Sequence, residues 1–185
     1  AGLAFWYDST NECQGIADGT ATAQWDDLSG NARHLLQATG ANQPTCQTAA
    51  GDLANGRPVL DFDGTNDSMV SAFASIGAAV TVFVVFDIDV DGTLFDGDDV
   101  TDRKRLISDG TVNGGAALVG ELANSVDTVY VRTVVFNGAS SASYRDGVTD
   151  VTGNAGANLL SGITVGAAYD GSPLSMFNGQ IMAVV

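Results

Sequence analysis

Apolar and polar residues alternate with a period of two along most of this chain. In the longest such segment, residues 80–92 (VTVFVVFDIDVDG), the even-numbered residues from Val80 to Val90 are all apolar and share one face. The odd-numbered residues share the other face, which is largely apolar at first and carries aspartates after Val85. The segment therefore predicts a long β-strand that is buried on both faces at first and exposed on one face later.

Further segments follow the same pattern. Residues 128–136 (TVYVRTVVF) combine β-branched and aromatic residues and predict a second strong strand. Recurrent Asp-Gly and Asn-Gly pairs mark turns, and only residues 31–38 (NARHLLQA) predict a helical turn. Weaker strands are predicted at residues 3–7, 57–62, 105–108, 116–122, 142–145, 162–167 and 180–185. About ten short strands with regular turns predict an all-β fold, a two-sheet antiparallel sandwich.

Length and charge limit what this chain can be. Its 185 residues contain no linker or repeat, so we expect a single domain, residues 1–185. Because the chain does not begin with Met, we expect it to be processed or to belong to a longer protein. The net charge is −15, and all acidic residues except Glu12 and Glu121 are Asp. Such a surface repels phosphate groups and anionic lipids, and no apolar stretch is long enough to cross a bilayer, so we expect neither nucleic-acid nor membrane partners.

Several stretches occur in a characteristic order. These are LAFWYD at 3–8, WDDLSGNARHLLQAT at 25–39, GRPVLDFDGTNDSM at 56–69, TVFVVF at 81–86, YRDG at 144–147, GITVGA at 162–167 and FNGQIMAVV at 177–185. In order and spacing the chain resembles the concanavalin A-like, laminin-G-like jelly-roll domains of bacterial extracellular proteins and of phage structural and tail proteins. The resemblance implies two antiparallel sheets packed face to face, with a concave face and rim loops. The chain departs from the family in its last strand, where Met182, Ala183 and Val184 replace a common carboxylate.

The sequence gives little support to catalysis. Glycosidases of this architecture pair two carboxylates, whereas Glu12 and Glu121 are far apart in the sequence and no Glu-x-Asp-x-Glu spacing occurs. His34 is the only histidine, and the nearest serine, Ser29, has no nucleophile-elbow context. We therefore expect His34 to make a structural hydrogen bond and the domain to be non-enzymatic.

Two aspartate-rich stretches are candidate Ca²⁺ sites. Residues 87–98 match the opening of an EF-hand loop, but a strand precedes them, and alternate residues of a strand stand about 6.6 to 7 Å apart, too far to share an ion. Residues 95–102 form a loop instead, and the favoured ligand set is Asp96, Asp98, Asp99 and Asp102.

The stretch DFDGTND at residues 61–67 has two interpretations. Asp63, Asn66 and Asp67 can bind a ligand, or their side chains can bond to the local backbone and fix the corner. Sugar binding also needs aromatic rings that stack on the ligand, for which Tyr144 and Tyr169 are candidates. Trp25 is interpreted as a core residue.

Cys13 and Cys46 are the only cysteines and lack the spacing of a zinc site. A disulfide between them fits an extracellular protein, and two separate buried thiols are the alternative.

The last predicted strand, residues 180–185, is apolar on both faces. A bare strand of this kind invites pairing at a sheet edge, so we expect that either later residues and the sandwich interior or a neighbouring subunit cover it. We also expect Met182→Asp to disrupt folding or assembly. We therefore expect a structural or adhesive module whose working surface is a subunit interface. The specific hypothesis is a phage virion protein, such as a capsid decoration or tail-fibre domain, in a homo-oligomer or lattice. A carbohydrate-binding module of a secreted bacterial protein, which contacts cell-surface glycans, is the alternative.

Overall fold

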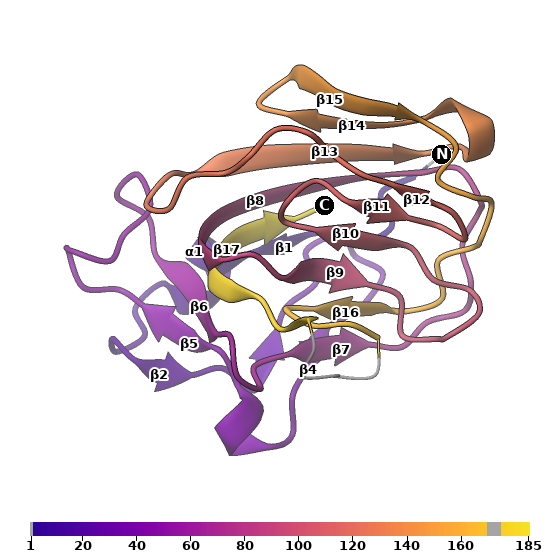
Figure 1. Ribbon diagram of the computed structural model, residues 1–185. Helices are drawn as coiled ribbons and strands as arrows, with labels where there is room; N and C mark the ends of the chain where they lie inside the picture. The colour runs from indigo at the N-terminus through magenta and orange to yellow at the C-terminus, as the bar shows by residue number, and fades with distance from the viewer. Residues whose placement is uncertain (1, 170–174) are drawn as a thin grey trace.

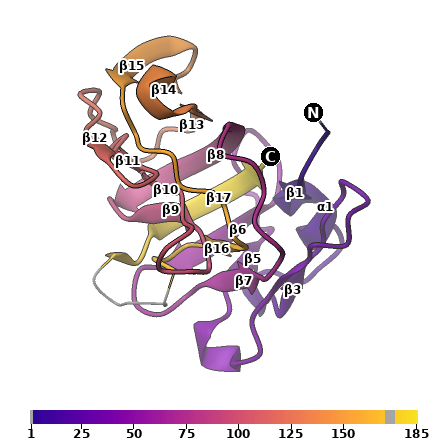
Figure 2. The same cartoon turned by 90° about the vertical axis from the view of Figure 1, so that its right-hand side faces the viewer.

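The computed structural model describes residues 2–169 and 175–185, and within them the chain forms two antiparallel β-sheets packed face to face (Figures 1 and 2). The nine-stranded sheet has the order β15-β14-β13-β8-β17-β6-β5-β2, and β1 also pairs with β17. The eight-stranded sheet has the order β12-β11-β10-β9-β16-β7-β4-β3. This is a two-sheet antiparallel jelly-roll sandwich of the concanavalin A-like kind, as the sequence predicts.

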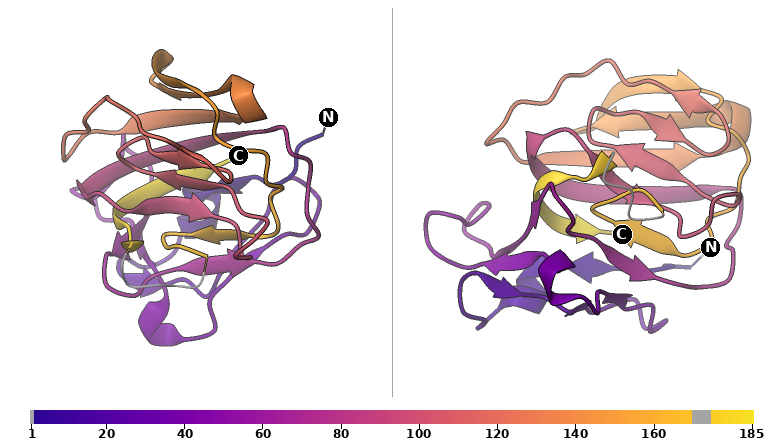
Figure 3. Two further views of the ribbon diagram at one scale, coloured as in Figure 1. Left: turned by 45° about the vertical axis from the view of Figure 1, so that its right-hand side comes forward. Right: turned by 60° about the horizontal axis from the view of Figure 1, so that its bottom comes forward.

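The strands are short except for three. The nine-stranded sheet contains β1 (Tyr7–Asp8), β2 (Thr20–Ala21), β5 (Thr45–Gln47), β6 (Val59–Asp63), β8 (Val80–Val90), β13 (Tyr130–Phe136), β14 (Ser141–Arg145), β15 (Val148–Gly153) and β17 (Asn178–Val184). The eight-stranded sheet contains β3 (Gln24–Trp25), β4 (Leu35–Leu36), β7 (Met69–Ser71), β9 (Thr93–Asp96), β10 (Arg105–Ile107), β11 (Val112–Asn113), β12 (Ala117–Leu118) and β16 (Ile163–Val165). One α-helix, α1 (Ser9–Cys13), and two 3₁₀ turns, η1 (Gly40–Asn42) and η2 (Gly138–Ser140), complete the described elements. The β14–β15 hairpin and the β2–β5 pair lie at opposite edges of the nine-stranded sheet (Figures 1 and 3).

The core lies between the inner faces of the two sheets. The even-numbered residues of β8 from Val82 to Ile88 are buried there, which confirms the alternation in the sequence. Phe86 packs edge-on against Phe177, and Phe95 of the facing sheet packs edge-on against Phe136. Trp25 is fully buried, as predicted. The prediction that β8 begins buried on both faces is wrong, because Phe83 on its outer face is 45% exposed.

The predicted helical turn at residues 31–38 is also wrong. Leu35 and Leu36 form β4 and pair with Trp25 and Gln24 of β3, so Leu35 is buried whereas Leu36 is exposed. The helix lies instead at Ser9–Cys13, where the Asp8 carboxylate accepts a hydrogen bond from the Thr10 N–H and caps the first turn. Within the described residues, none of the helical segments has the length and apolar character that a bilayer crossing requires.

Two predicted strands are shorter than expected because aspartate side chains accept hydrogen bonds from their backbone N–H groups. At residues 3–7, the Trp6 N–H donates to Asp27 Oδ1 (3.0 Å) and only Tyr7 belongs to the sheet. At residues 116–122, the N–H groups of Glu121 and Leu122 both donate to Asp150 Oδ1, and β12 is limited to Ala117–Leu118.

The last strand does not lie at a sheet edge. β17 is an interior strand that pairs with β8 on one side and with β6 and β1 on the other. Ile181 and Val184 are fully buried, while Met182 lies at an irregularity in the β8 pairing and is half-buried. The sandwich itself therefore covers the strand, and its apolar residues need no neighbouring subunit.

A disulfide joins Cys13 at the end of α1 to Cys46 of β5, with Cα atoms 5.5 Å apart. This confirms the bridge over the alternative of two separate thiols. Both residues are buried, so the bridge fixes the helix to the edge region of the nine-stranded sheet.

Candidate functional site

Two aromatic side chains share one row on the outer face of the nine-stranded sheet. Phe83 of β8 lies directly opposite Thr133 of β13, and Thr133 lies directly opposite Tyr144 of β14. Directly paired residues project to the same side of a sheet, so all three side chains point away from the core. Because strands lie about 4.8 Å apart, the two rings stand on backbone positions about 10 Å apart. We name Phe83, Thr133 and Tyr144 the aromatic row.

A second row on the same face, four residues further along β8, is polar. Asp87, Gln180 of β17 and Asp61 of β6 are direct partners in turn. Burial raises the pKa of Asp61, although a hydrogen bond from Gln47 opposes the shift. Burial likewise raises the pKa of Asp87, whose Oδ1 accepts a hydrogen bond from the Thr128 N–H at 2.8 Å. We name Asp61, Gln180 and Asp87 the polar row. The row places the Gln180 amide between two carboxyl groups, and burial disfavours the charged form of both carboxyl groups.

The surface between the two rows is apolar. Val131, Val85 and Ala183 lie side by side there, and Met182 is near Val85 at the edge of a hollow of about 230 Å³. The outer face therefore combines flat apolar area, two rings and a few hydrogen-bonding groups, which is the combination that binds the alternating apolar and hydroxyl faces of a sugar.

Tyr169, the other aromatic candidate, lies in a turn after β16, outside the nine-stranded sheet, and is already engaged. The Arg103 guanidinium sits 4.5 Å from the centre of its ring, and its backbone N–H donates to Asp96 Oδ2 (3.3 Å). Arg103 also forms an ion pair with Asp96, which is fully buried. Tyr169 and Tyr144 therefore belong to different surfaces.

The predicted Ca²⁺ ligands do not converge. Asp96 faces Arg103, and Asp99 Oδ1 accepts hydrogen bonds from the Thr101 N–H and hydroxyl and from the Asp102 N–H. The Asp98 N–H donates a hydrogen bond to the Ser161 carbonyl, and the Ser161 N–H donates one to the Asp102 carbonyl. In residues 2–169 and 175–185, no three His, Cys, Asp or Glu side chains are grouped so that they can hold a metal ion. Ca²⁺ binding by Asp96, Asp98, Asp99 and Asp102 stays a prediction that requires this loop to rearrange.

The DFDGTND corner is fixed by its own polar groups. Asp63 Oδ1 accepts hydrogen bonds from the N–H groups of Thr65 and Asn66, and Asp67 Oδ2 accepts one from the Asp63 N–H. Burial raises the pKa of Asp67. These bonds are the local turn chemistry that the residue types predict. Ligand binding by Asp63, Asn66 and Asp67 stays a prediction.

The histidine has structural partners. His34 Nδ1 lies 3.0 Å from Asp26 Oδ1 and accepts a hydrogen bond from the Asp27 N–H at 3.2 Å.

The comparisons with known proteins identify the fold. No family model and no curated protein matches this chain. Domain 4 of AbnA, a GH43 extracellular arabinanase from Geobacillus stearothermophilus solved with arabinotriose, is 12% identical, with a TM-score of 0.68 over 100% of this chain and 91% of that chain. Trypanosoma rangeli sialidase, solved with sialic acid, is 15% identical, with a TM-score of 0.60 over 100% of this chain but only 30% of the sialidase. At these identities the similarity shows the shared β-sandwich fold alone.

Sequence reasoning identified Tyr144 but missed Phe83, Thr133 and the polar row. The alternation in residues 80–92 already places Phe83 on the face opposite Val82 and Val84, so the exposure of Phe83 could be predicted from the sequence. Its position in line with Tyr144 could not be predicted from the sequence, because it depends on the register between β8 and β13, which are far apart in the sequence.

Proposed function

We propose that this domain is a non-catalytic carbohydrate-binding module of a secreted protein, and that it binds a glycan on the outer face of the nine-stranded sheet. The observation that carries the proposal is the aromatic row, in which Phe83 and Tyr144 flank Thr133 on an open sheet surface. The similarity of the whole chain to an arabinanase domain solved with arabinotriose supports a sugar ligand. The disulfide between Cys13 and Cys46 supports an oxidising, extracellular setting.

In this proposal the two rings form a platform for sugar rings, and Thr133 supplies a hydroxyl between them. The polar row accepts hydrogen bonds from hydroxyl groups further along the glycan, since Asp61 and Asp87 are half-buried and Gln180 adds an amide donor. A linear glycan that lies across β14, β13 and β8 and turns along β8 contacts both rows.

Calorimetric titration with arabinotriose, preceded by a glycan array to find the best ligand, tests this proposal. Phe83→Ala and Tyr144→Ala should each weaken binding about tenfold, the equivalent of about 1.4 kcal/mol, because each removes one stacking surface. Tyr169→Ala is the matched control and should leave the dissociation constant unchanged, since its ring lies outside the nine-stranded sheet and contacts Arg103. Loss of binding in Tyr169→Ala alone, or no binding to any glycan, would contradict the proposal.

A release assay tests the non-catalytic part. The domain should liberate no reducing sugar from the glycan it binds, because Glu12 and Glu121 are far apart in the sequence and no Glu-x-Asp-x-Glu spacing occurs. Release that disappears in Asp61→Asn or Asp87→Asn would make the domain an enzyme.

The virion hypothesis stays a prediction. A feature that favours a protein partner is the apolar strip of Val85, Val131 and Ala183, which a neighbouring subunit can cover as readily as a glycan. Detection of the chain in purified phage particles, together with self-association that Met182→Asp abolishes in folded protein, would favour a lattice role over glycan binding.

A further inference from the structure

Basic residues are scarce in this protein of net charge −15, yet Arg103, Lys104 and Arg105 are consecutive. Arg105 belongs to β10 and lies directly opposite Asn113 of β11, while the next residue, Leu106, is buried in the core. Directly paired residues project to the same side of a sheet. Arg105 and Asn113 therefore both point away from the core, on the outer face of the eight-stranded sheet (Figure 1).

A hollow of about 270 Å³ opens beside these two side chains. It is lined by Val100, Arg103, Arg105, Asn113, Gly115 and Asn158. These described lining residues include no Asp or Glu. Pockets for drug-sized ligands measure about 300 to 1,000 Å³, so a hollow of this size suits a smaller group such as one sugar unit. We name it the arginine hollow.

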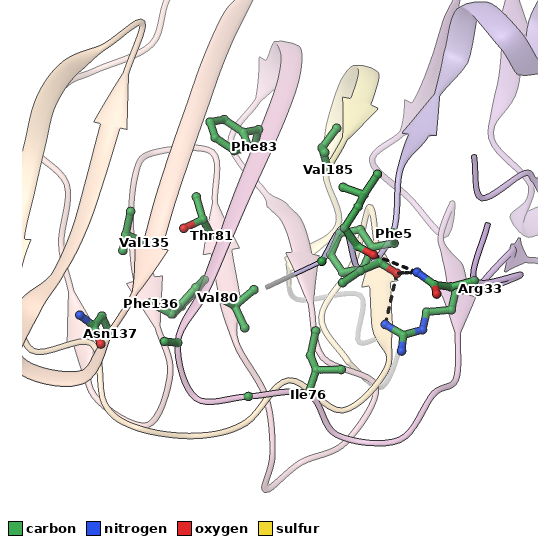
Figure 4. Close-up of a pocket in the computed structure, with 16 residues that line it drawn as sticks. Phe5, Arg33, Ile76, Val80, Thr81, Phe83, Val135, Phe136, Asn137 and Val185 are labelled. Carbon is green, nitrogen blue, oxygen red and sulfur yellow. Dashed lines mark hydrogen bonds between the residues drawn. The ribbon is translucent and has the colours of Figure 1, made fainter. Parts of the chain in front are cut away.

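The Arg105 guanidinium has an unused capacity to bind an anion. Within residues 2–169 and 175–185 it forms no ion pair, and its Nε is buried without a hydrogen-bond acceptor. A guanidinium is always charged and carries five N–H donors, so a partly buried one gains from an oxyanion. The other arginines that are not exposed have partners: Arg33 donates to the Ala4 carbonyl (Figure 4), Arg103 pairs with Asp96, Arg132 pairs with Asp150, and Arg145 donates to the Ala123 carbonyl.

The asparagines of the arginine hollow are held in place. Lys104 is fully buried and its Nζ donates to the Asn158 carbonyl, while the Asn158 N–H donates to the Gly114 carbonyl at 2.8 Å. Asn113 Oδ1 accepts a hydrogen bond from the Gly115 N–H at 3.0 Å. The Asn113 Nδ2 is thus the group of that amide that can donate to a ligand, and both asparagine amides can bond to hydroxyl groups.

Two carboxylates beside the arginine hollow already have cationic neighbours. Asp96 forms an ion pair with Arg103. Burial raises the pKa of Asp96, and Arg103 opposes this shift more strongly than Arg105 does. Burial lowers the pKa of Lys104, and the Asp102 carboxylate opposes that shift. Asp96 and Asp102 therefore balance Arg103 and Lys104, which leaves the charge of Arg105 for one further anion.

We infer that the arginine hollow is a separate binding site for a sugar unit that carries one carboxylate, a uronate. The carboxylate pairs with the Arg105 guanidinium, and the amides of Asn113 and Asn158 bond to ring hydroxyl groups. Arg103, which packs against the Tyr169 ring, forms a fixed wall. The aromatic row lies on the other sheet, so the glycan proposal and this inference can fail independently.

NMR titration of the ¹⁵N-labelled protein at constant ionic strength tests the ligand class. Methyl glucuronoside should shift the Gly115 N–H signal and bind about tenfold or more tightly than methyl glucoside, because only the uronate offers Arg105 a carboxylate. Acetate has the charge without the ring and should bind about fivefold or more weakly than the glucuronoside. Equal binding of the glucuronoside and the glucoside, or no binding of either, would overturn the inference. Equal binding of acetate and the glucuronoside would overturn the sugar as ligand.

Three variants locate the site. Arg105→Gln should weaken glucuronoside binding about tenfold or more and leave the melting temperature close to that of the wild type, because Arg105 has no ion pair to lose. Asn113→Asp keeps the acceptor of the Gly115 N–H but places a negative charge in the hollow, so it should also weaken binding about tenfold or more. Arg57→Gln makes the same charge change as Arg105→Gln at an exposed turn and should bind like the wild type, as should Phe83→Ala. If Arg105→Gln or Asn113→Asp, in folded protein, binds the glucuronoside as tightly as Arg57→Gln does, the arginine hollow is not the site.

Discussion

At the residue scale, the features that are hardest to predict from the sequence are the buried charges. Residues 128–136 predict a strand correctly, but their pattern does not reveal that Arg132 points inward between Tyr130 and Val134. Its guanidinium forms an ion pair with Asp150 of β15 and donates to the Ser108 carbonyl, and neither partner is near it in sequence. The same holds for the aromatic row, where composition identifies Tyr144 but only strand register joins it to Phe83.

Asp150→Ala should lower the free energy of unfolding by about 3 to 5 kcal/mol, because it leaves the buried Arg132 without its counter-charge. It also removes the acceptor of the Glu121 and Leu122 N–H groups. Urea denaturation measures the change, and Asp52→Ala, at an exposed turn, is the control with an expected change below about 0.5 kcal/mol. If Asp150→Ala unfolds at the same urea concentration as Asp52→Ala, the ion pair contributes nothing.

At the element scale, long alternating segments were predictable and short elements were not. β8 and β13 follow the sequence pattern closely because their inner faces are continuously apolar. Residues 31–38 contain good helix formers, yet Leu35 pairs with Trp25 in β4, so burial in the sheet outweighs helix propensity over so short a segment. The five-residue α1 has little stability of its own for the same reason, and it relies on the Asp8 cap and the disulfide.

Removal of the disulfide tests how far α1 depends on it. The Cys13→Ala/Cys46→Ala double variant should lose about 3 to 4 kcal/mol of unfolding free energy, because the bridge closes a loop with a sequence separation of 33 residues. Reductant should destabilise the wild type by a similar amount and leave the double variant unchanged. Alkylation of the denatured, unreduced wild type followed by intact-mass measurement provides the chemical control, and labelling of both cysteines would show that the bridge is absent.

At the scale of the whole molecule, the sandwich was predictable but the order of its strands was not. Strand count, turn residues and the family resemblance are all local or sequential signals. The position of β17 inside the nine-stranded sheet depends instead on β1 and β6 reaching it from distant parts of the chain. Without that information, the sequence leaves open whether the sandwich interior or a neighbouring subunit covers a terminal strand that is apolar on both faces.

The net charge of −15 makes the response to Ca²⁺ a property of the whole molecule as well as of the 95–102 loop. Any salt screens the repulsion between aspartates, so the effect of Ca²⁺ must be compared with Mg²⁺ and with NaCl at matched ionic strength. If the loop binds Ca²⁺, Asp99 must release the Thr101 and Asp102 N–H groups, and only the folded chain offers the ligands.

Ca²⁺ at one hundred times its dissociation constant should then stabilise the fold by about 2.7 kcal/mol, which corresponds to a rise in melting temperature of roughly 5 to 10 °C for a protein of this size. The rise should exceed that with Mg²⁺ or NaCl, and Asp98→Asn/Asp102→Asn should remove the excess. Asp52→Asn makes the net charge less negative by one at an exposed site outside the loop, and this variant should retain the excess rise with Ca²⁺. Identical melting curves in Ca²⁺, Mg²⁺ and NaCl would assign the whole effect to screening, because a specific site must distinguish ions of equal charge by size and ligand geometry.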